Sequence, residues 1–434
     1  MKSLRAFLIG MTMVAVVSDY LLHPFYPQFF EARFGVTNPK VVGYYFAAIC
    51  FMVMLAFPFW AYVSRKVAEL KILVYTQLVA GILALYCFWT TSYDHFWVAS
   101  LTMICFKGSY LLVYPYILKI IRPDQHTRTI GVLSVVVHLG GILGAVIGGL
   151  VVDLINPAYI FLVMAAGDFI QMLMSMYLLR SKRFDTTRQE VTDQAVAEKP
   201  PLIPNGFVLK IGLITLVLYF SDFLIRPFFS RYWEAISAYD SKLVSGFVYA
   251  IPGFVAVVAL GLSWKHTSNN DQKYRGISIA LLLGMVGLFL QASSLEAVVL
   301  LGRVVYGWAI FQGMVRFDAL LFQFSTPESY AIDYSKIHFF QNLGVLLASF
   351  SVGFVVDAQG LQMPFWVALL GFGVSFGAYY GLFRSQMKQD QSGEANHSDD
   401  GLHSDANGAM PDRGVAINSQ ESAPDKAAPQ HVDL

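Results

Sequence analysis

Apolar runs of about twenty residues, long enough to cross about 30 Å of hydrocarbon as helices, recur along this chain. Helices satisfy their own backbone hydrogen bonds in lipid, whereas the strands of a membrane barrel would show short segments of alternating polarity. Hydrophobic residues make up 56% of the 434 residues and charged residues only 14%, which is too few charges for an ordinary soluble protein. We therefore predict an all-α integral membrane protein.

The apolar runs predict twelve transmembrane helices, at residues 6–30, 41–63, 71–91, 96–118, 129–152, 157–179, 207–229, 243–264, 275–293, 297–323, 336–356 and 363–384. Lysine and arginine are retained on the cytoplasmic side of a membrane protein. Twenty of these residues fall in alternate loops that begin with the N-terminus, against five in the opposite loops. Both termini are therefore predicted to be cytoplasmic.

Composition divides the chain into four segments. Residues 1–182 and 207–386 each hold six of the predicted helices. Residues 183–206, between them, are polar and contain three prolines, which predicts a cytoplasmic linker. Residues 387–434 are poor in apolar residues and rich in Asp, Ser, Asn and Gln, which predicts a disordered acidic cytoplasmic tail.

The two halves repeat one another. SDYLLHPF at residues 18–25 aligns with SDFLIRPF at residues 221–228, an offset of 203. HLGGILGAVIGGLVVD at residues 138–153 aligns with NLGVLLASFSVGFVVD at residues 342–357, an offset of 204. A nearly constant offset over six helices indicates a duplicated unit. We therefore predict two six-helix bundles related by pseudo-symmetry.

Two parallel six-helix halves joined by a cytoplasmic linker resemble the major facilitator superfamily of transporters. In that family the halves rock about a central site near the midplane, so that the site opens to each side of the membrane in turn. The resemblance covers residues 1–386. It implies a monomeric transporter in a bacterial inner membrane, with a small-molecule substrate, protons and the lipid bilayer as its partners.

The fifth predicted helix carries a spaced set of glycines. The family's antiporter motif there has a glycine, eight residues, a glycine, three residues, Gly-Pro, two residues and Gly-Gly. This chain matches every glycine and has alanine in place of the proline; the residues are Gly131, Gly140, Gly144, Ala145, Gly148 and Gly149. The resemblance places this motif between the halves and associates it with export. Ordinary packing of small residues in a membrane helix is the alternative.

Ionisable residues at membrane depth are costly and commonly mark substrate or proton pathways. Asp19 and Asp222 hold equivalent positions, and each has a basic residue four positions later on the same helix face, His23 and Arg226. Asp222 is expected to form a structural pair with Arg226, whereas Asp19 has only His23 beside it and is the better proton carrier. Both pairs could instead anchor the outer interface. The candidates for proton coupling are Asp19, His23, Asp168 and Asp222.

Lys107 lies midway through the fourth predicted helix, where an unpaired ammonium group would be expensive. It either pairs with an acid such as Asp168 or Asp19, or receives an anionic group of the substrate. The substrate-cavity candidates share a polar or cationic side chain at membrane depth; they are Lys107, Gln312, Arg316, Arg226 and Arg303.

Two other family motifs are incomplete. The loop after the second predicted helix, within residues 60–71, keeps a basic pair but has Ser64 where the family has an acid. Arg303 and Gly307 match the spacing of the family's helix-four motif, although they lie in the tenth predicted helix.

The glycine motif and the buried acids favour proton-coupled export of a small organic molecule. The buried cations favour an anionic or zwitterionic metabolite, such as a carboxylate-bearing siderophore or an antibiotic. An uptake symporter of the same fold is one alternative, and a non-transporting membrane sensor that acts through the tail is another. The sequence has no metal-ligand spacing, nucleophile elbow or phosphate loop. We therefore predict no enzyme, no metal, no cofactor and no nucleic-acid partner.

Overall fold

The computed structural model describes residues 2–113, 116–117, 126–180, 206–239, 241–265, 273–324 and 330–404. The predicted linker falls outside these residues except for Gly206, and so does the predicted tail beyond Ser404. The α-helices are α1 (Lys2–Tyr20), α2 (Tyr26–Phe34), α3 (Pro39–Val63), α4 (Glu69–Trp89), α5 (Tyr93–Lys107), α7 (His126–Leu154), α8 (Ile160–Arg180), α9 (Gly206–Ile225), α10 (Phe229–Ile236), α11 (Lys242–Lys265), α12 (Lys273–Gln291), α13 (Glu296–Phe324), α14 (Tyr330–Gln359) and α15 (Met363–Ser404). Short 3-10 helices are η1 (His23–Phe25), η2 (Gly108–Leu112) and η4 (Pro157–Tyr159).

Within the described part of the chain, eleven helices are long and apolar enough to cross a membrane. The prediction of an all-α membrane protein is thereby confirmed. The fourth predicted span, at residues 96–118, is not among these eleven: it begins as α5, which has only 15 residues, and then gives way to the 3-10 helix η2. The change comes at Gly108, directly after Lys107, and glycine costs about 1 kcal/mol in a helix interior. The prediction of one continuous α-helix is therefore wrong here.

The first helix of each half is also interrupted, at the same place in the repeat. α1 and α2 are separated by a turn that contains Pro24, and α9 and α10 by a turn that contains Pro227. Proline has no backbone N–H, and its ring clashes with the carbonyl four residues earlier. The single helices predicted at residues 6–30 and 207–229 are therefore each two helices.

The duplication predicted from the sequence is visible in how the helices pack. A side chain on Gly167 of α8 would overlap the hydroxyl of Ser18 in α1. At the equivalent place in the second half, a side chain on Gly371 of α15 would overlap the hydroxyl of Ser221 in α9. Because each serine directly precedes an aspartate, this packing holds Asp19 and Asp222 in matching positions.

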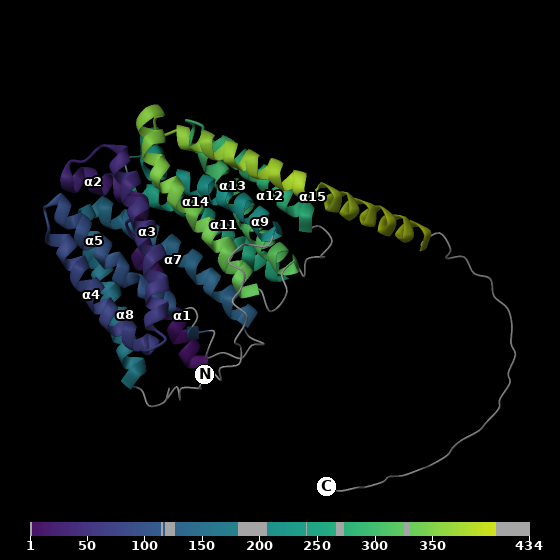
Figure 1. The fold of residues 1–434 in the computed structure, drawn as a ribbon. Coiled ribbons are helices and arrows are strands. Elements are labelled where there is room, and N and C mark those ends of the chain that lie inside the picture. The colour runs from purple at the N-terminus through teal and green to yellow at the C-terminus, as the bar shows by residue number, and fades with distance from the viewer. Residues whose placement is uncertain are drawn as a thin grey trace, which may run out of the picture. The chain divides into compact units, whose positions relative to one another are not determined.

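Two helix pairs join the halves, α3 with α14 and α7 with α11 (Figure 1). A Cβ on Gly43 of α3 would lie 3.0 Å from the backbone nitrogen of Gly353 in α14. A Cβ on Gly246 of α11 would lie 2.5 Å from the carbonyl oxygen of Ala145 in α7. Gly43 and Gly246 are equivalent in the repeat, so both boundaries use the same close backbone approach.

Polar contacts between the halves gather at the end that carries α2 and α10. Arg231 of α10 forms an ion pair with Glu31 of α2. Glu234 of α10 accepts a hydrogen bond from Nε2 of Gln28 in α2, at 2.9 Å. Glu31 and Glu234 are separated by 203 residues, as are Gln28 and Arg231. The two contacts are therefore counterparts of each other across the pseudo-symmetry axis.

The same end is reinforced at the starts of α3 and α11. Nζ of Lys40 lies 2.7 Å from Oδ2 of Asp357 at the end of α14. Asp153 at the end of α7 accepts hydrogen bonds from the backbone nitrogen of Lys242, at 3.1 Å, and from the hydroxyl of Ser241, at 2.8 Å. A carboxylate of each half thus contacts the first turn of a helix in the other half, Asp357 at α3 and Asp153 at α11. A carboxylate is favourable at a helix N-terminus.

α15 continues as a helix to Ser404, into the segment for which composition predicts disorder. Extending an existing helix needs no new nucleus, and no proline occurs before Pro411 to end it.

Candidate functional site

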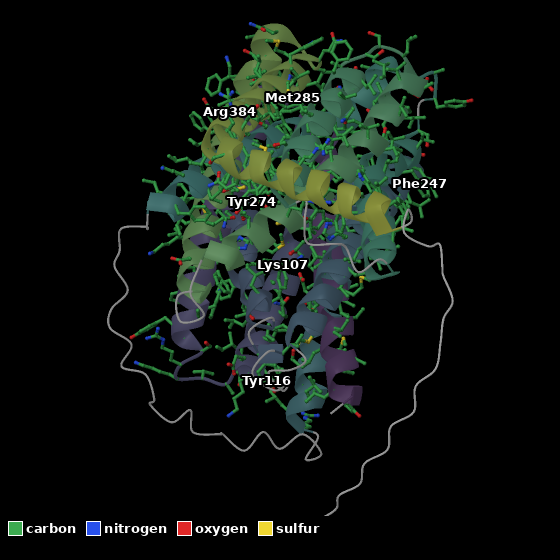
Figure 2. The ribbon with its side chains drawn as sticks, turned by 90° about the vertical axis from the view of Figure 1, so that its right-hand side faces the viewer. Lys107, Tyr116, Phe247, Tyr274, Met285 and Arg384 are labelled. Carbon is green, nitrogen blue, oxygen red and sulfur yellow. The ribbon has the colours of Figure 1, made fainter. Side chains whose placement is uncertain are left out.

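Lys107 ends α5 and lies inside the bundle of helices (Figure 2). Its Nζ is 2.9 Å from Oδ1 of Asp19 and 3.4 Å from Oδ1 of Asp168. The three residues come from α5, α1 and α8, so the ion pairs cross-link three helices of the first half. We call this group the acid–lysine triad.

Burial separates the members of the acid–lysine triad. The side chain of Asp168 is 0% exposed and that of Lys107 is 5% exposed, whereas that of Asp19 is 28% exposed. A buried ion needs a partner of opposite charge, and Lys107 supplies it for both acids. The side chain of Tyr110, in η2, also lies against Asp19. Asp19 is therefore the part of the triad that a solute can reach most easily.

His23 does not partner Asp19, which corrects the expectation that His23 is the neighbour of this carboxylate. Its Nδ1 lies 3.3 Å from the hydroxyl of Tyr249 in α11, and its ring lies between those of Tyr20 and Phe46. His23 lies in η1, beyond the end of α1. His23 thus joins the two halves.

Asp222 forms the predicted pair with Arg226 in the second half. It also accepts a hydrogen bond from the hydroxyl of Tyr306 in α13, at 2.7 Å, a contact that the sequence did not predict. The side chain of Asp222 is 3% exposed and that of Arg226 is 26% exposed. The accessible charge of this pair is therefore the guanidinium, and we call these three residues the second-half cluster.

Arg303 has a structural role that was missed because its partners are two backbone carbonyls of α11 and, at 3.4 Å from Nη1, the side-chain oxygen of Gln291 in α12. Its Nε donates to the carbonyl oxygen of Val248 at 3.2 Å, and its Nη2 donates to that of Tyr249. Pro252 in α11 has no N–H, so the carbonyl of Val248 lacks its usual helical partner. Gly307 lies one turn after Arg303 and meets Pro252, where a Cβ would come 2.6 Å from its Cα. Arg303 and Gly307, one turn apart in α13, thus both accommodate Pro252 of the neighbouring helix α11.

Gln312 and Arg316 contact each other and not the second-half cluster. Nη1 of Arg316 donates to the side-chain oxygen of Gln312 and, at 3.3 Å, to its carbonyl oxygen. The guanidinium lies against Gly276 in α12. Arg316 therefore packs between α12 and α13.

The glycines of the antiporter-like motif, predicted in the fifth helix, belong to α7 and lie on two of its faces. Side chains at Gly140 and Gly144 would clash with α1, and one at Gly148 with Leu21 directly after it, all in the same half. One at Gly149 would come 2.6 Å from the carbonyl oxygen of Lys242 in α11. Among the motif residues whose surroundings the structure describes, three therefore pack within the half, and Ala145 and Gly149 touch the other half. Gly131 also lies in α7.

A family model described as Major Facilitator Superfamily matches residues 8–316. The chain belongs to that family of multi-pass membrane transporters, which carry small-molecule substrates and are not enzymes.

Individual relatives are distant. The multidrug resistance protein MdtG of Salmonella choleraesuis is 22% identical over 248 residues, which are 55% of this chain and 60% of MdtG. The chain thus spans about three fifths of the length of this relative. The uncharacterized MFS-type transporter YuxJ of Bacillus subtilis is 23% identical over 68% of this chain and 76% of its own length. The crystal structure of the nucleoside transporter NupG has a TM-score of 0.68 at 12% identity, over 88% of this chain and 98% of NupG.

Proposed function

We propose that this chain exports a small organic molecule in exchange for protons, by alternating access. Membership of the family supports transport, and the likeness to a multidrug resistance protein supports export. The observation that carries the proposal of proton coupling is the acid–lysine triad, which holds two carboxylates beside one buried ammonium group. The proposed location is a bacterial inner membrane, with both termini cytoplasmic.

The triad leaves one negative charge unmatched among the helices. A proton on either carboxylate would make it neutral, and a neutral site is less costly to enclose in hydrocarbon than a charged one. In this proposal Asp19 takes the proton because it is the exposed acid, while Asp168 stays buried and orients Lys107. A cationic group of the substrate could replace that proton, which would couple the two fluxes in opposite directions.

The accessible charges of the two halves favour a zwitterionic substrate. The first half offers the carboxylate of Asp19, and the second half offers the guanidinium of Arg226. A molecule with one amine and one acidic group would match both signs. Zwitterionic antibiotics and siderophores that carry both amine and carboxylate groups belong to this class. Since Lys107 is already paired with two acids, we propose Arg226 in its place as the residue that receives the anionic group.

The polar contacts of α2 with α10 support an inward-facing state. The distribution of lysine and arginine predicts that this end faces outward. In the proposed cycle, these contacts seal the outer side while substrate enters from the cytoplasm, and they separate when the halves rock.

Everted membrane vesicles with a respiration-driven acidic interior provide the test. We expect addition of norfloxacin, a zwitterionic antibiotic with an amine and a carboxylate, to release protons from vesicles that contain the protein. Acridine orange fluorescence reports this release, and vesicles without the protein are the control. We also expect the released protons to be matched by accumulation of the compound inside the vesicles. Accumulation in intact cells would instead identify an uptake symporter.

A further inference from the structure

An apolar groove lies on the outside of the first half, where the end of α3, the start of α4 and the end of α5 meet. It has a volume of about 230 Å³ and is lined by Trp60, Val63, Ile72, Tyr75, Val79 and Phe106, among others. This volume lies below the roughly 300–1,000 Å³ of sites that enclose a drug-sized molecule. None of its lining residues belongs to the acid–lysine triad or the second-half cluster, so the groove is a separate feature from the proposed substrate path.

Two of the polar side chains that line the groove, Trp60 and Thr76, form hydrogen bonds within the protein. Nε1 of Trp60 donates to the carbonyl oxygen of Cys105 at 2.8 Å. The hydroxyl of Thr76 donates to the carbonyl oxygen of Ile72 at 2.8 Å and lies 2.6 Å from that of Ser109. These lining residues thus present apolar surface, which suits a hydrocarbon chain. From Ile72 to Val79 the groove extends along α4 for about 10 Å.

Three exposed basic residues are close in sequence to the lining residues Val63, Val67 and Ile72. Arg65 and Lys66 lie between α3 and α4, and Lys71 lies in the first turn of α4, together with the acid Glu69. Ser64, at the start of the turn between α3 and α4, is uncharged. The lysine and arginine distribution predicts that this turn lies at the cytoplasmic surface, where anionic lipids attract basic segments.

We propose that this groove binds one acyl chain of an anionic phospholipid, whose phosphate is held by Arg65, Lys66 and Lys71. The apolar groove and the basic residues adjoin near the turn between α3 and α4. An anionic phospholipid carries the complementary parts, an acyl chain and a phosphate, in one molecule. A zwitterionic phospholipid would match the groove but not the net positive charge beside it.

Trp60 provides a probe at the site itself. The full-length protein is prepared with Trp60 as its only tryptophan, the other six being replaced by phenylalanine. It is reconstituted in phosphatidylcholine bilayers that contain dibrominated phosphatidylglycerol or dibrominated phosphatidylcholine. Bromine quenches tryptophan fluorescence on contact. We expect the binding constant of phosphatidylglycerol relative to phosphatidylcholine to be several-fold above one.

The charge-removal variant Arg65→Gln/Lys66→Gln/Lys71→Gln should return this ratio to one. Arg384→Gln, a change at an exposed residue of α15 (Figure 2), is the matched control and should leave it unchanged. Equal quenching by the two lipids would overturn the proposal, and so would an absence of quenching, which would mean that protein covers the groove. If the single-tryptophan protein does not fold, native mass spectrometry of the unmodified chain with each lipid gives the same comparison.

Discussion

Asp19 and Asp222 occupy the same position in the two halves, yet their surroundings differ in charge. In the second half one carboxylate meets one guanidinium from the turn directly after its own helix, and Tyr306 adds a hydrogen bond. In the first half the cation comes from α5 and is shared with a second carboxylate, Asp168. The second-half cluster is therefore balanced, whereas the acid–lysine triad has a spare negative charge. We infer that duplication supplied the position and that later divergence made only one copy suitable for a proton.

The largest effect is expected from removing the shared cation. Lys107→Leu leaves two acids without their partner, and breaking a buried ion pair in this way costs about 3–5 kcal/mol of unfolding free energy. Arg226→Leu should cost less, because Asp222 keeps the hydrogen bond from Tyr306. Thermal or denaturant unfolding of the purified variants in detergent measures both.

A second substitution checks the cause of that loss. Asp168→Leu, added to Lys107→Leu, removes the fully buried acid and should recover part of the stability. If Lys107→Leu were as stable as the original chain, the ion pairs of the triad would not be holding these helices together.

Substitutions at the motif glycines of α7 are expected to have the next largest effect on stability. A Cβ on Gly148 would clash with the carbonyl oxygen of Leu21, the residue directly after α1, so Gly148→Ala should cost about 3 kcal/mol. Gly141→Ala is the matched control, because its Cβ would lie at an ordinary 3.5 Å from Tyr20. The equivalent residue of the second half is Val352, which is fully buried. Similar stability of the two alanine variants would show that α7 does not approach α1 so closely.

Substitution of Arg303 tests whether this buried cation of the second half stabilises the fold. Arg303→Leu leaves the carbonyl of Val248 without a donor, at a cost of about 1–3 kcal/mol. In a Pro252→Ala background, the restored N–H can bond that carbonyl within α11, so the same change should cost less. A double-mutant cycle of unfolding free energies measures the coupling. Equal costs in both backgrounds would disprove this account of Arg303.

The smallest effect is expected where α2 meets α10. Glu31 and Arg231 are both well exposed, so Glu31→Gln should cost only about 0.2–1 kcal/mol. Glu234 is more buried and accepts from Gln28, so Glu234→Gln should cost more than its counterpart. Unfolding of the two variants side by side gives the ranking, and the reverse order would contradict the geometry described for this end.

Much of this architecture follows from linear patterns. Apolar runs predict most of the helices, and the repeat predicts that Asp19 and Asp222 match. The Asp222 and Arg226 pair is also predictable, because four residues separate its members on one helix. The breaks at Pro24 and Pro227 were missed, because the apolar runs continue across both prolines and the spans were predicted from apolar content.

Contacts between distant segments could not be assigned from the sequence. Lys107 had several acids within reach of its helix, and only the packing of α1, α5 and α8 shows that it meets both Asp19 and Asp168. Arg303 bonds to backbone carbonyls, which leave no trace in a pattern of residue types. Nothing in the sequence distinguishes Tyr306 from the other tyrosines of the predicted helices, although its hydroxyl donates to Asp222.

The most direct test of the difference between the halves asks which aspartate binds a proton, and it needs no known substrate. Infrared spectra of the reconstituted protein in acidic and alkaline buffer reveal carboxyl groups that gain and lose protons. We predict that Asp19→Asn removes a protonated-carboxyl band that both the original chain and Asp222→Asn retain. An Asp19→Asn spectrum with that band at full intensity would contradict the assignment of the proton to Asp19.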